Sequence, residues 1–64
     1  MAIFSEYEYL NRYTAGQTAV DRGEWRIAFD CFNDCKAYLE RYRSWDTEEI
    51  RKLEKLSEWC NSMF

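Results

Sequence analysis

Three cysteines are the side chains best suited to chemistry in this chain of 64 residues. Cys31 and Cys35 stand one helical turn apart, and Cys60 falls on the apolar stripe of a later helix. Three thiolates and one carboxylate would make a zinc site, but structural zinc sites pair cysteines across short turns more often than along a helix. Free cysteine is among the most buried residue types. We therefore expect core packing, no metal site and no cofactor, with a Cys35–Cys60 crosslink as an alternative.

Other catalytic side chains are scarce. The chain has no histidine, which is the commonest general base near neutral pH. Its two glycines, Gly16 and Gly23, stand too far apart to form a phosphate-binding loop. Carboxylates are numerous, but they stand at helix starts and on polar faces, where capping or solvation explains them. We expect no enzymatic activity.

The charge balance indicates which kinds of partner the chain is expected to bind. Twelve acidic and nine basic side chains give a net charge of −3, and the first 35 residues carry the excess. An acidic chain without a basic stripe is not expected to bind nucleic acid. The sequence shows neither a signal peptide nor an apolar run of about 20 residues that would cross a membrane. An odd number of cysteines suits reduced thiols, so we expect a cytoplasmic protein. The sequence opens with Met1 and contains no linker, so we expect a complete small protein.

The helix predicted at residues 24–43 organises the chain. Its apolar residues recur at three- and four-residue spacing and form one stripe: Trp25, Ala28, Phe32, Cys35, Leu39 and Tyr42. Ile27, Cys31 and Tyr38 widen this stripe on one side and Phe29 on the other, to an arc of roughly 200°. A helix with a single neighbour needs about half of that arc. We therefore expect this helix to lie between two others.

The first helix is predicted at residues 6–22. Ser5 and Glu8 have the spacing of a capping box, and Phe4 and Tyr9 that of a hydrophobic staple over the same cap. Its inward stripe is predicted to contain Tyr9, Tyr13, Gly16 and Val20. The glycine predicts a close approach of another helix.

Gly23 is expected to end the first helix in a left-handed conformation. The connection to residues 24–43 is then very short, which makes these two helices an antiparallel hairpin. A third helix is predicted at residues 47–61, with Asp46 and Glu49 as a capping box and a staple in front of it. The staple pairs Trp45 with Ile50. The expected fold is all-α: one domain, residues 1–64, in which the third helix packs on the hairpin as a three-helix bundle.

The first forty residues resemble a single tetratricopeptide repeat. The resemblance rests on Ala15, Gly16, Gly23, Trp25, Ala28, Phe32 and Cys35, which stand at the spacings of that family. The chain departs from the pattern at Arg12, Ala15, Ala19 and Glu40, where the family has tryptophan, leucine, tyrosine and proline. Proteins of this family are scaffolds for peptides or partner proteins. The resemblance implies a capping role for the third helix and a binding groove on the first, which would include Leu10, Tyr13, Gln17 and Asp21.

Aromatic side chains exceed what so small a core can enclose. Tyr7, Tyr38 and Trp59 stand outside the inward stripes or at their edges, where tyrosine and tryptophan are typical of binding hot spots. Their alternative role is to cover the edges of the core. An acidic face is expected to attract a basic surface on a partner: Glu6, Glu8, Asp21, Glu24, Asp30 and Asp34.

These features favour a small interaction module that binds another protein and modulates or blocks it, as an adaptor or an inhibitor. Such proteins are often encoded by phages or mobile elements, and steric blocking is preferred to mimicry of nucleic acid because the net charge is modest. A second hypothesis is a structural subunit of a larger assembly, or a homodimer formed through Ile27, Cys31 and Tyr38. A third is a metal or redox sensor that uses the cysteines.

Overall fold

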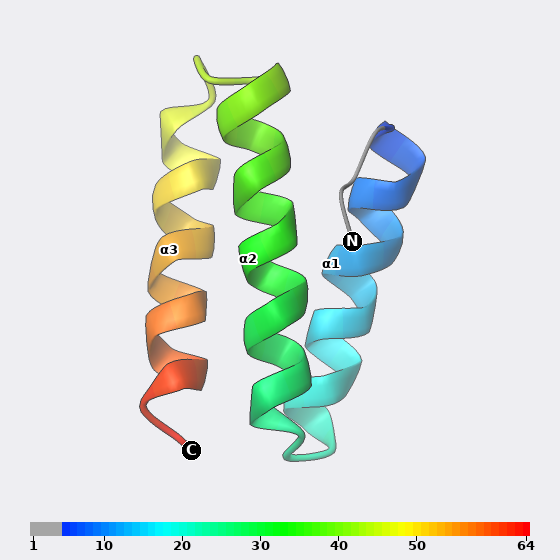
Figure 1. Ribbon diagram of the computed structural model, residues 1–64, viewed down its shortest axis with the longest axis vertical. Helices are drawn as coiled ribbons and strands as arrows, with labels where there is room; N and C mark the ends of the chain where they lie inside the picture. The colour runs from blue at the N-terminus through cyan, green and yellow to red at the C-terminus, as the bar shows by residue number, and fades with distance from the viewer. Residues whose placement is uncertain (1–4) are drawn as a thin grey trace.

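The computed structural model describes residues 5–64, which form three helices and no strand: α1 (Glu6–Asp21), α2 (Trp25–Tyr42) and α3 (Thr47–Asn61). α2 lies in the middle and runs antiparallel to both of its neighbours (Figure 1). α1 and α3 each pack along α2 but make few contacts with one another. The all-α fold with a central second helix is confirmed, and each helix end lies within one residue of the sequence prediction. None of these three helices is long and apolar enough to cross a bilayer.

Gly23 shapes the turn between α1 and α2. Its φ angle of 73° lies in the left-handed region that glycine adopts without strain. The Gly23 N–H donates to the Val20 carbonyl at 3.0 Å, and the Glu24 N–H donates to the Ala19 carbonyl at 2.8 Å. These two bonds make a Schellman motif, which satisfies the last carbonyls of α1 and reverses the chain. The predicted role of Gly23 is confirmed.

The two predicted helix caps differ in outcome. Ser5 Oγ accepts the Glu8 N–H at 3.2 Å, as expected for the start of α1. Phe4, the other half of that predicted staple, lies outside the described residues. At α3 the capping box is wrong, because the Asp46 side chain caps no backbone N–H. Its carboxylate instead accepts Arg43 Nη2 at 2.8 Å.

The staple predicted before α3 is also wrong. Trp45 exposes 76% of its surface, so it does not cover the first turn of that helix. Ile50 packs against the core without it.

Most of the core comes from α2, as its wide apolar arc predicts. Six of its residues are buried: Ala28, Cys31, Phe32, Cys35, Tyr38 and Leu39. α3 adds Leu53 and Cys60, and α1 adds Tyr9 and Ala19. The last member of the predicted stripe, Tyr42, is exposed instead.

α1 and α2 approach each other closely at Gly16. A Cβ atom at this position would stand 2.7 Å from Phe32 Cε1. The Phe32 ring is buried and contacts the Tyr13 ring edge-on, with 5.9 Å between the ring centroids. It therefore has little freedom to move away, and the predicted close approach at Gly16 is confirmed.

Candidate protein-interaction groove

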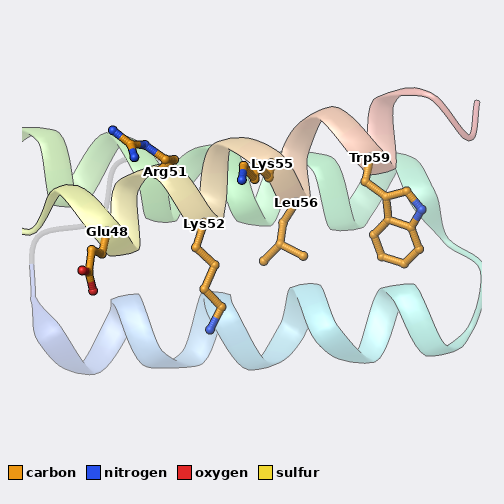
Figure 2. A pocket seen from close by; sticks show the side chains of 6 residues that line it. All are labelled: Glu48, Arg51, Lys52, Lys55, Leu56 and Trp59. Carbon is orange, nitrogen blue, oxygen red and sulfur yellow. The ribbon is translucent and has the colours of Figure 1, made fainter.

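One side of α1 and of α3 remains uncovered. Because both helices pack on α2 and hardly touch each other, a groove runs between them with α2 as its floor. Lys52, Leu56 and Trp59 point from α3 toward α1 across this space (Figure 2). We call this feature the α1–α3 groove.

The half of the groove near the C-terminal ends of α1 and α3 has a volume of about 460 Å³. Its α1 wall consists of Tyr13, Gln17, Val20 and Asp21. Its α3 wall consists of Lys52, Leu56 and Trp59, and Phe32 of α2 closes the floor. Aromatic and aliphatic groups therefore line most of this half, with charged groups at its margins.

A second depression of about 500 Å³ continues from this half along the outer edge of α3. It shares Lys52, Leu56 and Trp59 with the groove. Its other lining residues, Arg51, Lys55 and Glu48, come from the same helix (Figure 2). The apolar surface of the groove thus passes directly into a charged rim on α3.

The opposite end of the groove is smaller and more polar. Its volume is about 360 Å³, and Glu6, Arg43, Asp46 and Glu49 are among its lining residues. The Arg43 guanidinium donates to Glu6 Oε1 and to Asp46 Oδ2, both at 2.8 Å. It therefore ties the first turn of α1 to the loop that precedes α3.

Lys52 stands between the two halves, since it lines both. Its Nζ lies 5.8 Å from the centroid of the Tyr13 ring, which is close enough for a cation–π contact. The interaction with Tyr13, followed by that with the Glu49 carboxylate, raises the pKa of Lys52. A positive charge therefore stays at the middle of the groove at neutral pH.

Several predicted contact residues lie together here. Leu10, Tyr13, Gln17 and Asp21 of α1 all line the groove. Trp59 joins them from α3, although it stands far from them in the sequence. Leu10 is 56% exposed and Trp59 46%, so both offer apolar surface to a partner. Their role in binding stays a prediction.

Trp59 is held in place by a neighbouring ring. Its indole meets that of Trp25 edge-on, with 5.1 Å between the ring centroids. Trp25 packs against the core. The groove thus has a preorganised aromatic wall at its C-terminal end.

Tyr7 and Tyr38 do not lie in the groove. Tyr7 is 74% exposed but lines none of its three parts. Tyr38 was expected at a free edge and is 9% exposed, so its prediction as a contact residue is wrong. Its ring stacks on that of Tyr9 with centroids 5.3 Å apart, and its hydroxyl donates to Glu6 Oε2 at 3.0 Å. Burial, and then this hydrogen bond, raise the pKa of Tyr38.

The same burial removes the edge predicted for a homodimer. Cys31 and Tyr38 are buried within the monomer. Ile27 alone remains exposed, at 51%. One isoleucine does not make an interface of the size that a stable dimer needs.

All three thiols are buried and free. Cys35 Sγ donates to the Tyr9 carbonyl at 3.6 Å, and burial raises the pKa of this thiol to about 12. Burial also raises the pKa of Cys31 and of Cys60. Protonated, buried thiols are poor nucleophiles and poor metal ligands, so these residues act as packing groups. Within residues 5–64, no cluster of three or more potential metal-binding side chains occurs.

Part of the predicted acidic face is neutralised within the chain. Glu6 pairs with Arg43, and Asp34 pairs with Arg12. The attraction of a basic partner surface therefore depends on fewer carboxylates than the sequence suggests.

On the α3 wall the sequence predicts Trp59 as a contact residue but not Lys52 or Leu56. Leu56 packs against the core and also lines the groove. Lys52 was expected to pair with Glu48 on the outer surface. No ion pair joins Lys52 to Glu48. The signal was present, because Lys52, Leu56 and Trp59 recur at helical spacing on one side of the third helix.

Comparison of the sequence with profiles of protein families finds no match. Searches among curated proteins and among solved structures likewise return no similar protein. The tetratricopeptide resemblance therefore stays a prediction from the residues.

Proposed function

We propose that this chain is a small non-enzymatic interaction module that takes up a helical segment of a partner protein in the α1–α3 groove. By occupying that segment it acts as an adaptor or as an inhibitor. The observation that carries the proposal is the uncovered apolar surface between the two helices, lined by Tyr13, Val20, Phe32, Leu56 and Trp59. Buried, protonated thiols suit a reducing cytoplasm, where we place the interaction.

The shape of the groove favours a helix as its occupant. α1 and α3 run parallel and already hold α2 between them on one side (Figure 1). A helix seated on the other side would meet the same two neighbours and complete a four-helix arrangement. Recognition of this kind places the apolar face of an amphipathic helix in a hydrophobic groove, with anchors at three- and four-residue spacing.

The chemistry of the walls supports the same occupant. Trp59 and Tyr13 line opposite walls of one cavity, and tryptophan and tyrosine are enriched among binding hot spots. Both are held by neighbouring rings, Trp25 in one case and Phe32 in the other. Side chains that are already fixed lose little conformational entropy when a partner binds.

The homodimer hypothesis has less support. Two of the three residues predicted for its interface are buried within the monomer, whereas the groove is open. We therefore prefer a heterologous partner.

Site-specific photo-crosslinking tests the proposal. A photoreactive amino acid replaces Gln17, which is exposed on the α1 wall, and in a second variant replaces Ala37, which is exposed on α2 outside the groove. Both are introduced into the tagged chain in cells, and the crosslinked peptides are identified by mass spectrometry. The two sites match in helical context and exposure, so they differ mainly in their relation to the groove.

We expect position 17 to crosslink to one segment of one partner protein, with apolar residues at helical spacing, and position 37 to leave that partner unlabelled. Equal labelling from both positions, or labelling from position 37 alone, would contradict the proposal.

A further inference from the structure

We infer that the partner helix is acidic, with carboxylates that meet a cationic rim on α3. This inference rests on the proposed function and specifies the chemistry of the occupant. The rim consists of Arg51, Lys52 and Lys55, which line the depression beside the groove (Figure 2).

None of the rim cations is in an ion pair within the described part of the chain, although Tyr13 and, after it, the Glu49 carboxylate raise the pKa of Lys52. Two arginines elsewhere are paired: Arg12 with Asp34, and Arg43 with Glu6 and Asp46. By contrast, no ion pair within residues 5–64 involves a rim residue. Three cations outside any ion pair therefore lie along the α3 side of the apolar surface.

Cations outnumber carboxylates in the depression itself, whereas the polar half that Lys52 also lines contains Glu6, Asp46 and Glu49. Among the residues that line the depression, Glu48 is the only acid against the three cations. Asp21 is the one acid on the α1 wall of the C-terminal half, and it stands at the last residue of that helix. α3 as a whole carries four acids against these three cations, so the excess of positive charge is confined to the depression.

The spacing of the rim suits a helix. Arg51 and Lys55 stand one turn apart on the same side of α3, with Lys52 beside them toward the groove. Carboxylates one turn apart on a partner helix repeat at nearly the same distance, about 6 Å. A partner with an apolar stripe and acidic residues along one edge would match groove and rim at once.

The rim is opposite in sign to the chain, whose net charge is −3. A uniformly acidic protein repels an acidic partner, so the rim restricts attraction to one site and one orientation. The acidic face predicted from the sequence would repel the same helix elsewhere on the surface. Specificity then comes from attraction at the rim together with repulsion elsewhere on the surface.

A displayed library of helical peptides tests the inference on the intact chain. The peptides have 16 residues, the length of α1. A fixed stripe of leucines at helical spacing provides the apolar face, and the flanking positions vary among Glu, Lys, Gln and Ser. Selection uses the full chain, and each selected peptide is then measured against Gln17→Trp, which fills the groove from an exposed position.

The charge requirement is measured with variants of the rim. Lys52→Glu combined with Lys55→Glu reverses two rim charges, whereas Arg41→Glu makes the same kind of change on an exposed residue of α2 outside the groove. We expect selected peptides to be rich in Glu and to bind the rim variant at least roughly tenfold more weakly, with little change for Arg41→Glu. Their affinity is also expected to fall as the salt concentration rises.

Each outcome is informative. Peptides that bind the groove but show no excess of Glu, or that ignore the rim variant, would overturn the inference and leave the proposed function standing. If no selected peptide is weakened by Gln17→Trp, the groove does not take up helices, and both fail. Melting curves of the rim variant and of Gln17→Trp establish that each is folded, and Lys52→Gln with Lys55→Gln provides a milder charge change if the reversal unfolds the chain.

Discussion

α1 and α3 each have one side that packs on α2 and one side that faces the α1–α3 groove, and these sides differ in exposure. The side that meets α2 is closed: Leu39, Leu53 and Cys60 have no exposed surface. The side that faces the groove is open, with Leu10 and Trp59 about half exposed. The apolar arcs of α1 and α3 are therefore wider than one neighbour can cover. The chain therefore completes the packing on α2 within the monomer and leaves the second side open, and this open side is where we propose that a partner binds.

The two sides also differ in where their polar groups lie. On the closed side, the Cys35 thiol donates a hydrogen bond to the Tyr9 carbonyl, and apolar side chains make most of the remaining contacts. Along the groove, charged side chains stand at the margins of apolar walls. An apolar centre with a polar rim is typical of protein–protein interfaces.

Truncation in the closed side should have the largest effect. Leu53 is fully buried between α3 and α2, so Leu53→Ala is expected to lower the free energy of unfolding by about 3 kcal/mol. The free energy of unfolding of a chain of this size is only a few kcal/mol, so the variant should be largely unfolded at room temperature. Circular dichroism and urea titration measure this.

Ser57 provides the matched control. It is buried in the same helix, but its hydroxyl has no hydrogen-bond partner within the described part of the chain. Ser57→Ala should therefore leave stability unchanged or raise it, since an unsatisfied buried hydroxyl is removed. A loss as large as that of Leu53→Ala would mean that the closed side is not packed as described.

Alkaline pH should destabilise the closed side. Burial raises the pKa of Cys35 from 9.0 to about 12 and that of Tyr9 from 10.0 to about 12. Both groups favour the protonated, folded state, so their stabilisation is complete below pH 9 and is lost as the pH rises toward 12. The melting temperature should be level up to about pH 9 and fall above it.

Cys35→Ala removes one of the two groups. Its melting temperature will be lower at neutral pH, but the decline between pH 9 and pH 12 should be shallower. An equal decline in both proteins would show that Cys35 does not couple to folding.

Filling the contact at Gly16 should have a moderate effect. Gly16→Ala gains about 1 kcal/mol of helix propensity, but the new methyl group overlaps the Phe32 ring, which Tyr13 restrains. We expect a net loss of about 1 kcal/mol in the free energy of unfolding. Adding Phe32→Leu to Gly16→Ala should relieve the overlap, so the two substitutions together should cost less than the sum of their separate effects. A stabilised Gly16→Ala variant would contradict the close approach.

Breaking the polar end of the groove should have the smallest effect. Arg43→Ala removes ion pairs to Glu6 and Asp46, both of which are partly exposed. Such pairs contribute little, so we expect a loss of about 0.5–1 kcal/mol in a thermal melt. Arg22→Ala, an exposed arginine with no ion pair within residues 5–64, is the control and should change nothing measurable. A loss above 2 kcal/mol would mean that this end of the groove is part of the core.

The helices and the central place of α2 could be predicted because their signals are local. A stripe at helical spacing, a serine before the first turn and a glycine at Gly23 act within a few residues. The width of the arc on α2 then requires two neighbours, whatever their direction. The close approach at Gly16 follows from the absence of a side chain.

The errors arose where another side chain competes for a group or covers it, whether it stands near in the sequence or far away. Asp46 has the sequence of a cap, but the guanidinium of Arg43 takes its carboxylate. Tyr38 stands at the edge of its own helix and is buried because Tyr9 of α1 stacks on it. The groove depends on the separation of α1 and α3, which no pattern within either helix encodes. The residues of its α1 wall were predicted through the family resemblance, whereas on its α3 wall Trp59 was predicted and Lys52 and Leu56 were not.

The three tryptophans allow the most direct test of the groove. Trp59 lines it, Trp25 contacts Trp59 at its edge, and Trp45 is exposed in the loop before α3. Each gives one indole N–H signal in a ¹⁵N correlation spectrum. The probe is a synthetic peptide with the sequence of the segment crosslinked from position 17.

Titration with this peptide should shift the Trp59 signal most, the Trp25 signal less, and the Trp45 signal hardly at all. A shift of Trp45 with no change at Trp59 would place the partner outside the α1–α3 groove and contradict the account.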